Sequence, residues 1–372
     1  MSPIARKHLF EFLLFLGVLY VFFVSIEMMS EAFKLFGKGF ANSLMTSTSN
    51  PIVGLAIGVL ATSLVQSSSA TTSILVGLVA AGGLSITNAI PMVMGANIGT
   101  TVTNTIVSVG HINRRQEFSR ALAGATVHDF FNILAVLVFL PLERIFHFIE
   151  RSATFLSSTF DSAGGLKFVS PLKAIVKPTA HLVVDLLKHV ISSPAWASSL
   201  LILVCALVIL FTALKFMVTL MKKLIIGRVE NLLHQYLFSS PFTSLLLGLT
   251  ITSIIQSSSA TTSLIVPIVG AGILNVDQIF PYVLGTNIGT TITALMASLV
   301  TKSPAALTVA FAHLLFNVSG TLVFYPIRRI PISIARAFGK FTAQHRYVAI
   351  TYLLVCFYGL PFLFILLLKG GN

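Results

Sequence analysis

The sequence predicts an all-α polytopic membrane protein. It would contain two inverted repeats, each with a re-entrant hairpin plus about three spanning helices, and one extra C-terminal span. Three observations predict this class. Only 9% of the 372 residues are charged and 55% are hydrophobic, whereas soluble domains carry about 25% charged residues. Apolar stretches long enough to cross a bilayer recur along the chain. One segment also occurs twice.

The duplication is visible without gaps. Residues 51–107 align onto residues 241–297 at a constant offset of 190, and about 27 of these 57 pairs are identical. The octapeptide QSSSATTS begins at Gln66 and again at Gln256. After a five-residue shortening the offset becomes 185, which pairs His128 with His313. An internal repeat of this kind defines the architecture before any single motif is considered.

The first repeat is predicted over residues 9–141. Its elements are a span at about 9–29, a hairpin at 51–83, and spans at 88–109 and 119–141. Each limb of the hairpin is too short to cross a hydrocarbon core of about 30 Å. We therefore expect the Gln-Ser-Ser-Ser turn at membrane depth, where non-helical backbone is tolerated only beside protein or a watery cavity.

The second repeat is predicted over residues 197–326, after an extracellular linker at 142–196. Its elements are a span at 197–221, a hairpin at 241–272, and spans at 279–300 and 305–326. Residues 327–372 would supply a basic cytoplasmic loop and a last span at about 347–368. Three crossings per repeat is an odd number, so we expect the second copy to be inverted relative to the first.

Charge distribution predicts the orientation. Fourteen of the 24 Lys and Arg residues lie in four short stretches between apolar runs, at 6–7, 114–120, 215–228 and 328–346. The positive-inside rule then places the N-terminus in the cytoplasm and the protein in the plasma (inner) membrane. Because the net charge of +13 forms no single patch, we expect a lipid bilayer and not a nucleic acid as partner. Cys205 and Cys356 lie in apolar spans and are expected as free thiols.

The two octapeptides form the candidate site, because each is polar and uncharged inside apolar sequence. Hydroxyl and amide oxygens suit a hard cation, while hydroxyl, amide and backbone donors suit an oxyanion. A multiply charged anion in a neutral site needs counter-charge, which bound sodium ions would supply. The structural alternative is serine and threonine bonding to their own helix. The glutamine amides and the duplication favour binding.

A second polar set follows the hairpins. Gly95 and Gly99, like Gly285 and Gly289, have the spacing that lets helices pack closely. Close helix packing explains the glycines but does not explain the polar residues beside them. We expect them to face the hairpin turns: Asn97, Thr100, Thr103, Asn287, Thr290 and Thr293.

Asp129 is the only acidic residue deep inside a predicted span. An ionisable residue in that position is a functional-site hypothesis by default. Asn132 lies three residues further on the same helical face, whereas the repeat equivalent of Asp129 is Leu314. The alternative is that Asp129 pairs with His128 or a basic residue for structure.

At the two QSSS motifs and at AGATVHDFFN, residues 123–132, the sequence closely resembles the type II sodium-dependent phosphate cotransporter family from about residue 15 to 365. The resemblance implies phosphate and sodium sites in the two QSSS regions, at Gln66, Ser67, Ser68, Ser69, Gln256, Ser257, Ser258 and Ser259. We add Asn97, Thr100, Asn287, Thr290 and Thr293 to this site. Charge-moving members carry an aspartate at the position of Asp129, which implies an additional sodium site at Asp129 and Asn132.

The expected function is therefore a sodium-coupled symporter that imports inorganic phosphate by alternating access. A ratio of about three Na⁺ per HPO₄²⁻ would make transport electrogenic. We expect no enzymatic activity and no cofactor, with Na⁺ as the coupling ion. The alternatives are a sodium symporter of another small oxyanion or dicarboxylate, an ion channel, and an intramembrane serine hydrolase. The hydrolase is disfavoured because adjacent serines in both halves suit a ligand cage better than one activated nucleophile.

Overall fold

The computed structural model describes residues 3–165, 170–190, 195–236 and 240–368. Every regular element in these ranges is helical, which confirms the predicted all-α class. Residues 3–190 form these elements: α1 (Pro3–Leu35), α2 (Gly37–Ser47), α3 (Pro51–Val65), α4 (Ser68–Ala80), α5 (Ile86–Gly99), α6 (Val102–Val109), α7 (Arg115–Phe146), α8 (Phe148–Ser162) and α10 (Ser170–Val190).

The remaining described residues begin with the longest helix and end with a helix that contains a π-helical turn. The elements are α11 (Ala195–Tyr236), α12 (Pro241–Ile255), α13 (Ser258–Ser263), α14 (Val266–Gly270), α15 (Val276–Thr301), α16 (Pro304–Phe324), α17 (Arg329–Gln344), α18 (Tyr347–Leu354), the π-turn η1 (Val355–Gly359) and α19 (Leu360–Leu368).

Six described helices are long and apolar enough to cross a membrane: Leu13–Leu35, Arg115–Phe146, Trp196–Leu220, Val276–Thr301, Pro304–Phe324 and Tyr347–Leu368. Their burial differs widely. The most apolar stretch of Val276–Thr301 is 72% buried, whereas that of Tyr347–Leu368 is only 11% buried. An exposed surface this apolar is stable only against lipid. The chain is therefore a multi-pass membrane protein with α15 in its interior and the last helix at its edge.

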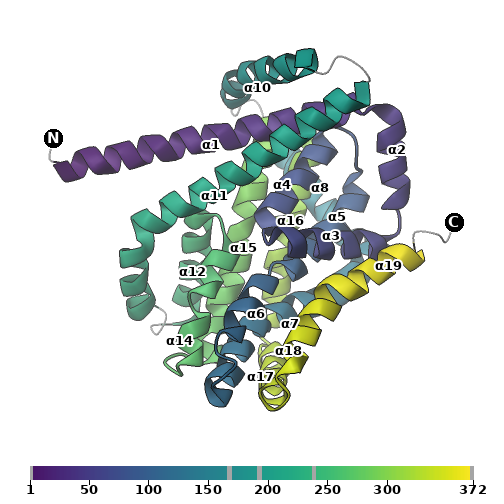
Figure 1. Ribbon diagram of the computed structural model, residues 1–372. Helices are drawn as coiled ribbons and strands as arrows, with labels where there is room; N and C mark the ends of the chain where they lie inside the picture. The colour runs from purple at the N-terminus through teal and green to yellow at the C-terminus, as the bar shows by residue number, and fades with distance from the viewer. Residues whose placement is uncertain (1–2, 166–169, 191–194, 237–239, 369–372) are drawn as a thin grey trace.

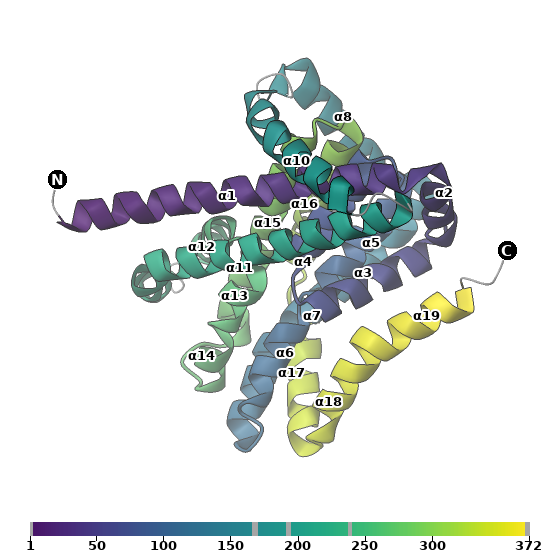
Figure 2. The same cartoon turned by 45° about the horizontal axis from the view of Figure 1, so that its top comes forward.

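The molecule has two opposite ends, each formed by different helices (Figures 1 and 2). Helices α8 and α10 lie at one end, whereas α14, α17 and the turn between α6 and α7 lie at the opposite end. Helices α1 and α11 run side by side across the molecule. The contacts between α3 and α5 have their counterpart in those between α12 and α15.

Two glycines allow these last pairs to pack closely. A Cβ atom on Gly95 would lie 2.1 Å from the carbonyl oxygen of Leu55, and one on Gly285 would lie 2.0 Å from that of Leu245. No side chain fits at such a distance, so the backbones of α3 and α5, and of α12 and α15, touch directly. The small-residue packing expected from the spacing is present in both repeats.

Replacing Gly95 by alanine should therefore lower stability by about 2 kcal/mol or more, because the two helices must separate to admit a methyl group. Thermal unfolding of the purified protein measures the effect. Gly17→Ala is the matched control, since it also lies in a helix but has no atom within 4 Å of the added Cβ. Equal unfolding temperatures for the two variants would contradict the close approach.

The two hairpins have nearly the same backbone. Proline begins α3 and α12, and the side chains of Asn50 and Ser240 cap them. Both helices end at a glutamine in the left-handed region, with φ 57° at Gln66 and 63° at Gln256. The next residue is extended, and its hydroxyl caps the following helix. These turns separate two short apolar helices in each repeat, and the re-entrant course of the hairpins stays a prediction.

Three details differ from the sequence predictions. Residues 88–109 are not one helix, since α5 ends at Gly99 and α6 begins at Val102, whereas α15 is continuous. The polar and β-branched run continues through Asn104, Thr105 and Ile106 after the break, whereas α15 has the better helix formers Ala294, Leu295 and Met296 at the equivalent positions. The second limb of hairpin two is also broken, with Pro267 in the first turn of α14. The predicted linker 142–196 contains α8 and α10.

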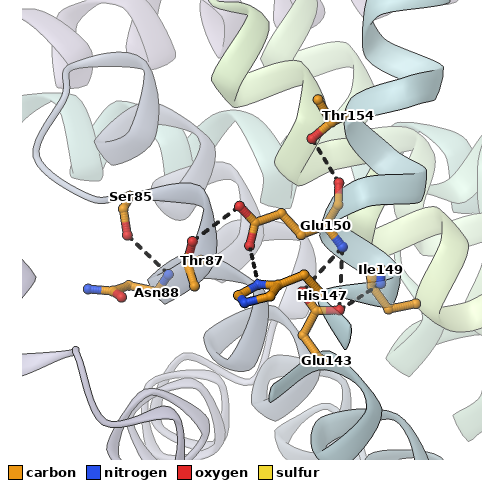
Figure 3. A network of polar contacts seen from close by, with 8 residues as sticks. All are labelled: Ser85, Thr87, Asn88, Glu143, His147, Ile149, Glu150 and Thr154. Carbon is orange, nitrogen blue, oxygen red and sulfur yellow. Dashed lines mark hydrogen bonds and ion pairs between the residues drawn. The ribbon is translucent and has the colours of Figure 1, made fainter. Parts of the chain in front are cut away.

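Helices α7 and α8 meet at a polar joint (Figure 3). His147 adopts φ 51° and separates the two helices. The carboxylate of Glu143 accepts the backbone N–H of Ile149 at 2.6 Å and that of Glu150 at 3.2 Å. Glu150 in turn accepts from Thr87 and contacts His147. The Glu143 carboxylate thus caps α8, and the Glu150 carboxylate joins α8 to the start of α5.

Candidate functional site

The turn of the second hairpin contacts both the turn of the first hairpin and the break between α5 and α6. The Ser69 hydroxyl donates to the carbonyl oxygen of Gln256 at 3.1 Å. The Ser259 hydroxyl donates to the carbonyl oxygen of Thr100 at 3.2 Å, at the break between α5 and α6. Residues 187 and 159 positions apart in the sequence are thereby brought into direct contact. The structure joins Ser69 with Gln256, and Ser259 with Thr100, as parts of one polar region.

This region contains no ionised side chain from either octapeptide. Ser68 and Ser258 are buried, and their carbonyl oxygens accept the hydroxyls of Thr72 and Thr262. Ser67 and Ser257 cap the helices that follow them. The hydroxyls of Thr100 and Thr290 bond back to their own helices. Several predicted site residues therefore stabilise the turns, while Ser69, Ser259 and Gln256 extend between the two halves.

The two glutamines differ although their sequences and backbones match. Gln256 is only 5% exposed, and its amide oxygen accepts from the Thr293 hydroxyl at 3.0 Å. Gln66 is exposed. Thr103, the repeat equivalent of Thr293, has a buried hydroxyl with no hydrogen-bond partner among the described residues. The polar contact made by the second hairpin is therefore not made by the first.

Three predicted asparagines lie in a buried network that joins the two repeats. Its members are at most 2% exposed: Asn97, His128, Asn132, Asn287, His313 and Asn317. His128 Nε2 contacts Asn287 Oδ1 at 3.0 Å, and His313 Nε2 contacts Asn97 Oδ1 at the same distance. The Asn287 amide donates to Asn132, and the Asn97 amide donates to Asn317. We call these six residues the Asn–His network.

The network follows the symmetry of the duplication. Exchanging each residue for its repeat equivalent converts one His–Asn contact into the other, and it converts the Asn132 to Asn97 carbonyl bond into the Asn317 to Asn287 bond. Most of these amide groups are satisfied by one another. The sequence predicted these asparagines as site residues. It did not predict their hydrogen bonds across the repeats, because no local pattern marks a contact between distant segments.

Asp129 lies apart from this network and is 0% exposed. The Tyr352 hydroxyl donates to its Oδ2 at 3.0 Å, and the Thr101 side chain lies beside it. Oδ1 has no hydrogen-bond partner in the described part of the chain. No basic side chain among the described residues forms an ion pair with Asp129, and His128 instead contacts Asn287. The carboxylate therefore has an unused oxygen in a buried position.

Tyr352 was not predicted as a site residue. It belongs to the last span, 223 residues after Asp129, and this span has no copy in the first repeat. Tyr358 on the same span donates to the carbonyl oxygen of Ser63 in the first hairpin at 3.0 Å. Only 11% of the most apolar stretch of the last span is buried, and these two tyrosines are its polar attachments to the site.

The comparisons agree with this architecture. The family model described as Na⁺/Pi-cotransporter matches twice, at residues 21–151 and 209–339, one match in each repeat. The chain belongs to the Na⁺/Pi-cotransporter family. Both hairpins, the Asn–His network and Asp129 lie inside the matched ranges of this cotransporter family member.

Curated relatives cover almost the whole chain. It is 37% identical over 420 residues to sodium-dependent phosphate transport protein 2A of Rattus norvegicus. It is 34% identical over 440 residues to sodium-dependent phosphate transport protein 2B of Homo sapiens. Each alignment includes 94% of this chain, which spans 66% of the rat protein and 64% of the human one. No solved structure gives a significant match.

Proposed function

We propose that this protein is a sodium-coupled symporter that imports inorganic phosphate by alternating access. The observation that carries the proposal is the meeting of two uncharged hairpin turns, with Ser69 on Gln256 and Ser259 on Thr100. Membership of the Na⁺/Pi-cotransporter family and the names of the relatives support the same substrates.

The chemistry of the turns favours coupled binding. Serine hydroxyls and glutamine amides offer both donors for phosphate oxygens and acceptors for sodium. Neither octapeptide carries a charge, so phosphate alone would leave an uncompensated double negative charge in a low-dielectric site. Sodium ions bound beside it remove that cost. A neutral site of this kind binds the two substrates together more favourably than it binds phosphate alone.

The difference between the glutamines supports alternating access. The second hairpin has its glutamine buried on Thr293, whereas the first has an exposed Gln66 and an unpartnered Thr103 hydroxyl. A two-state carrier with inverted repeats requires that, in any one state, its two equivalent turns adopt different arrangements, and these two turns have the same octapeptide sequence. In the opposite state we expect Gln66 to reach Thr103 while Gln256 becomes exposed.

A cysteine at position 66 should then react with a membrane-impermeant thiol reagent at least about tenfold faster than one at position 256. Both variants are made in a background where Cys205 and Cys356 are serine. Sodium with phosphate should reduce the difference, because substrate binding permits the exchange between states. Equal reaction rates in sodium-free buffer would contradict the proposed exchange of hairpin states.

Asp129 is proposed as part of an additional sodium site. A buried carboxylate with one unused oxygen and no basic partner among the described residues is costly unless a cation is bound. Three sodium ions with HPO₄²⁻ move one net positive charge, whereas two would move none. We therefore propose electrogenic transport with about three Na⁺ per phosphate.

Uptake by proteoliposomes tests the function directly. Phosphate should accumulate when sodium is higher outside and should not accumulate with an equal potassium gradient. Sulfate, succinate and arsenate as competitors distinguish phosphate from other oxyanions or dicarboxylates. Phosphate entry that ignores the sodium gradient would contradict the symporter, and flux far above carrier rates without a fixed coupling ratio would indicate a channel.

The basic residues support a cytoplasmic position for the end of the molecule that contains α17. Two of the four basic stretches, residues 114–120 and 328–346, lie at this end, at the start of α7 and in and around α17 (Figure 1). The positive-inside rule assigns that end to the cytoplasm. The accessibility of a tag inserted at either end of α17 tests this orientation. Labelling of the tag from the outer face of the membrane would contradict it.

A further inference from the structure

A basic pocket lies at the end of the molecule that contains α14 and α17. Its volume is about 430 Å³. Helix α7 of the first repeat, the segment between α14 and α15 of the second repeat, and α17 together line it. Three basic side chains face it, Arg120, Arg336 and Lys340, and its lining includes no acidic residue. It lies apart from the hairpin turns and is not used in the proposed transport cycle.

Arg120 is held in place by the backbone. Its Nε donates to the carbonyl oxygen of Gly270 at 3.0 Å. A Cβ on Gly272, which has φ +80°, would lie 3.1 Å from the guanidinium carbon. The glycine thus leaves room for the guanidinium to lie against the chain. The two terminal nitrogens of Arg120 make no hydrogen bond within the described ranges, which leaves planar donors available to a ligand.

The other two cations come from one face of α17. Arg336 is paired with Asp277, and Lys340 lies one turn further along the helix. Lys340 has no ion pair with the residues that the structure describes. Even when Asp277 is counted against Arg336, two positive charges remain. An anionic group in the pocket would be attracted by both and would accept bonds from Arg120.

The pocket lies where two membrane helices begin. Ser119 and Ala123 are in the first turns of the candidate span Arg115–Phe146, and Val276 starts the span Val276–Thr301. Exposed apolar residues of α17, Ile330, Ile334 and Phe341, accompany its basic residues. An amphipathic basic helix at a span boundary is typical of the headgroup region of a bilayer.

The duplication does not account for the pocket. The repeat equivalent of Arg120 is Ala305, and that of Lys340 is Phe155. At the opposite end of the molecule, the joint between α7 and α8 instead has Glu143 and Glu150, whose equivalents are Arg328 and Ala335 (Figure 3). Arg336 does have an arginine, Arg151, as its repeat equivalent. Two of the three cations of the pocket, Arg120 and Lys340, are therefore found at only one of the two related positions.

We propose that this pocket binds a phosphoryl group, supplied by the headgroup of an anionic phospholipid or by free phosphate. Such a group would bridge Arg120 of the first repeat and Lys340 on the helix that follows the second repeat. The unesterified phosphoryl oxygens, which both sources share, match the fork of the arginine and the point charge of the lysine. The site is separate from the transport site and does not depend on sodium.

Thermal unfolding of the full-length protein in neutral detergent and sodium-free buffer tests the proposal. The probes are short-chain phosphatidylglycerol, phosphatidylcholine with the same chains, and inorganic phosphate. A ligand that binds the folded state raises the unfolding temperature in a saturable manner. We expect this for phosphatidylglycerol or for phosphate, and not for phosphatidylcholine. A response to the lipid alone assigns the headgroup, and a response to phosphate alone assigns the free anion.

The variant Arg120→Gln with Lys340→Gln should shift the saturating concentration at least about tenfold. Arg120→Lys with Lys340→Arg keeps the charge and should retain saturable binding. The matched control is Arg115→Gln with Arg329→Gln, which removes the same charge outside the lining and should respond like the parent. The proposal is overturned if phosphatidylcholine acts as well as phosphatidylglycerol, if neither anionic probe acts, or if the pocket variant and the control respond alike.

Discussion

Replacing Asp129 by glycine is expected to silence the phosphate-dependent current while sodium-driven phosphate uptake continues. The reason is charge balance, since loss of one sodium ion per cycle leaves two positive charges against HPO₄²⁻. The buried carboxylate has one oxygen bonded to Tyr352 and the other without a partner among the described residues. Current and tracer uptake measured on the same proteoliposomes give the charge moved per phosphate.

Two tyrosines of the last span provide a control for this prediction. Tyr352→Phe removes the donor to Asp129 and should raise the sodium concentration for half-maximal uptake about threefold, as expected for one lost hydrogen bond. Tyr358→Phe removes a bond to the Ser63 backbone from the same span and should leave that sodium dependence unchanged. An unchanged charge per phosphate in Asp129→Gly would refute the stoichiometry.

The Asn–His network predicts the largest effect on stability. Asn287→Ala removes the partner of His128 and a donor to Asn132, and it leaves both groups buried without replacement. Each buried polar group left unsatisfied costs about 1–3 kcal/mol. We therefore expect a markedly lower unfolding temperature in buffer that contains neither sodium nor phosphate.

Thr126→Val is the matched control for Asn287→Ala. Thr126 is equally buried, but its hydroxyl bonds only within its own helix, to the carbonyl of Leu122. Its unfolding temperature should stay close to that of the parent. The sequence also suggested Asn287 as a ligand. If ligand binding were its sole role, Asn287→Ala would keep the parent's stability in ligand-free buffer and lose only sodium or phosphate affinity.

The duplication made much of this architecture predictable. A constant offset placed both hairpins, and the local signals for their limbs were strong: a proline at the start, a capping residue before it and a serine cap after the turn. The shortened offset of 185 identified His128 and His313 as equivalents. Local sequence can specify such features because capping and turn geometry depend on a few neighbouring residues.

Other features depend on distant partners or on the state of the molecule. Tyr352 reaches Asp129 from a span that is not duplicated, so no repeat position marks it. Gln66 and Gln256 lie in identical octapeptides and still differ in exposure, because their exposure depends on contacts with residues outside the octapeptides, such as the bond from Thr293 to Gln256. The helix break before Val102 was not predicted, because the polar pattern is shared by both repeats. Predicting it would have required a comparison of helix propensities between the two repeats.

The positions of the helix breaks have a consequence for energetics. In the first half α4 is unbroken and the next helix is interrupted, whereas in the second half the limb that contains Pro267 is interrupted and α15 is unbroken. In the proposed cycle the two halves exchange conformations, and because their helices are broken at different places the two states should differ in free energy. Without substrate, the proposed carrier should therefore populate one of its two states more than the other. The sodium gradient would then shift an equilibrium that already favours one side of the membrane.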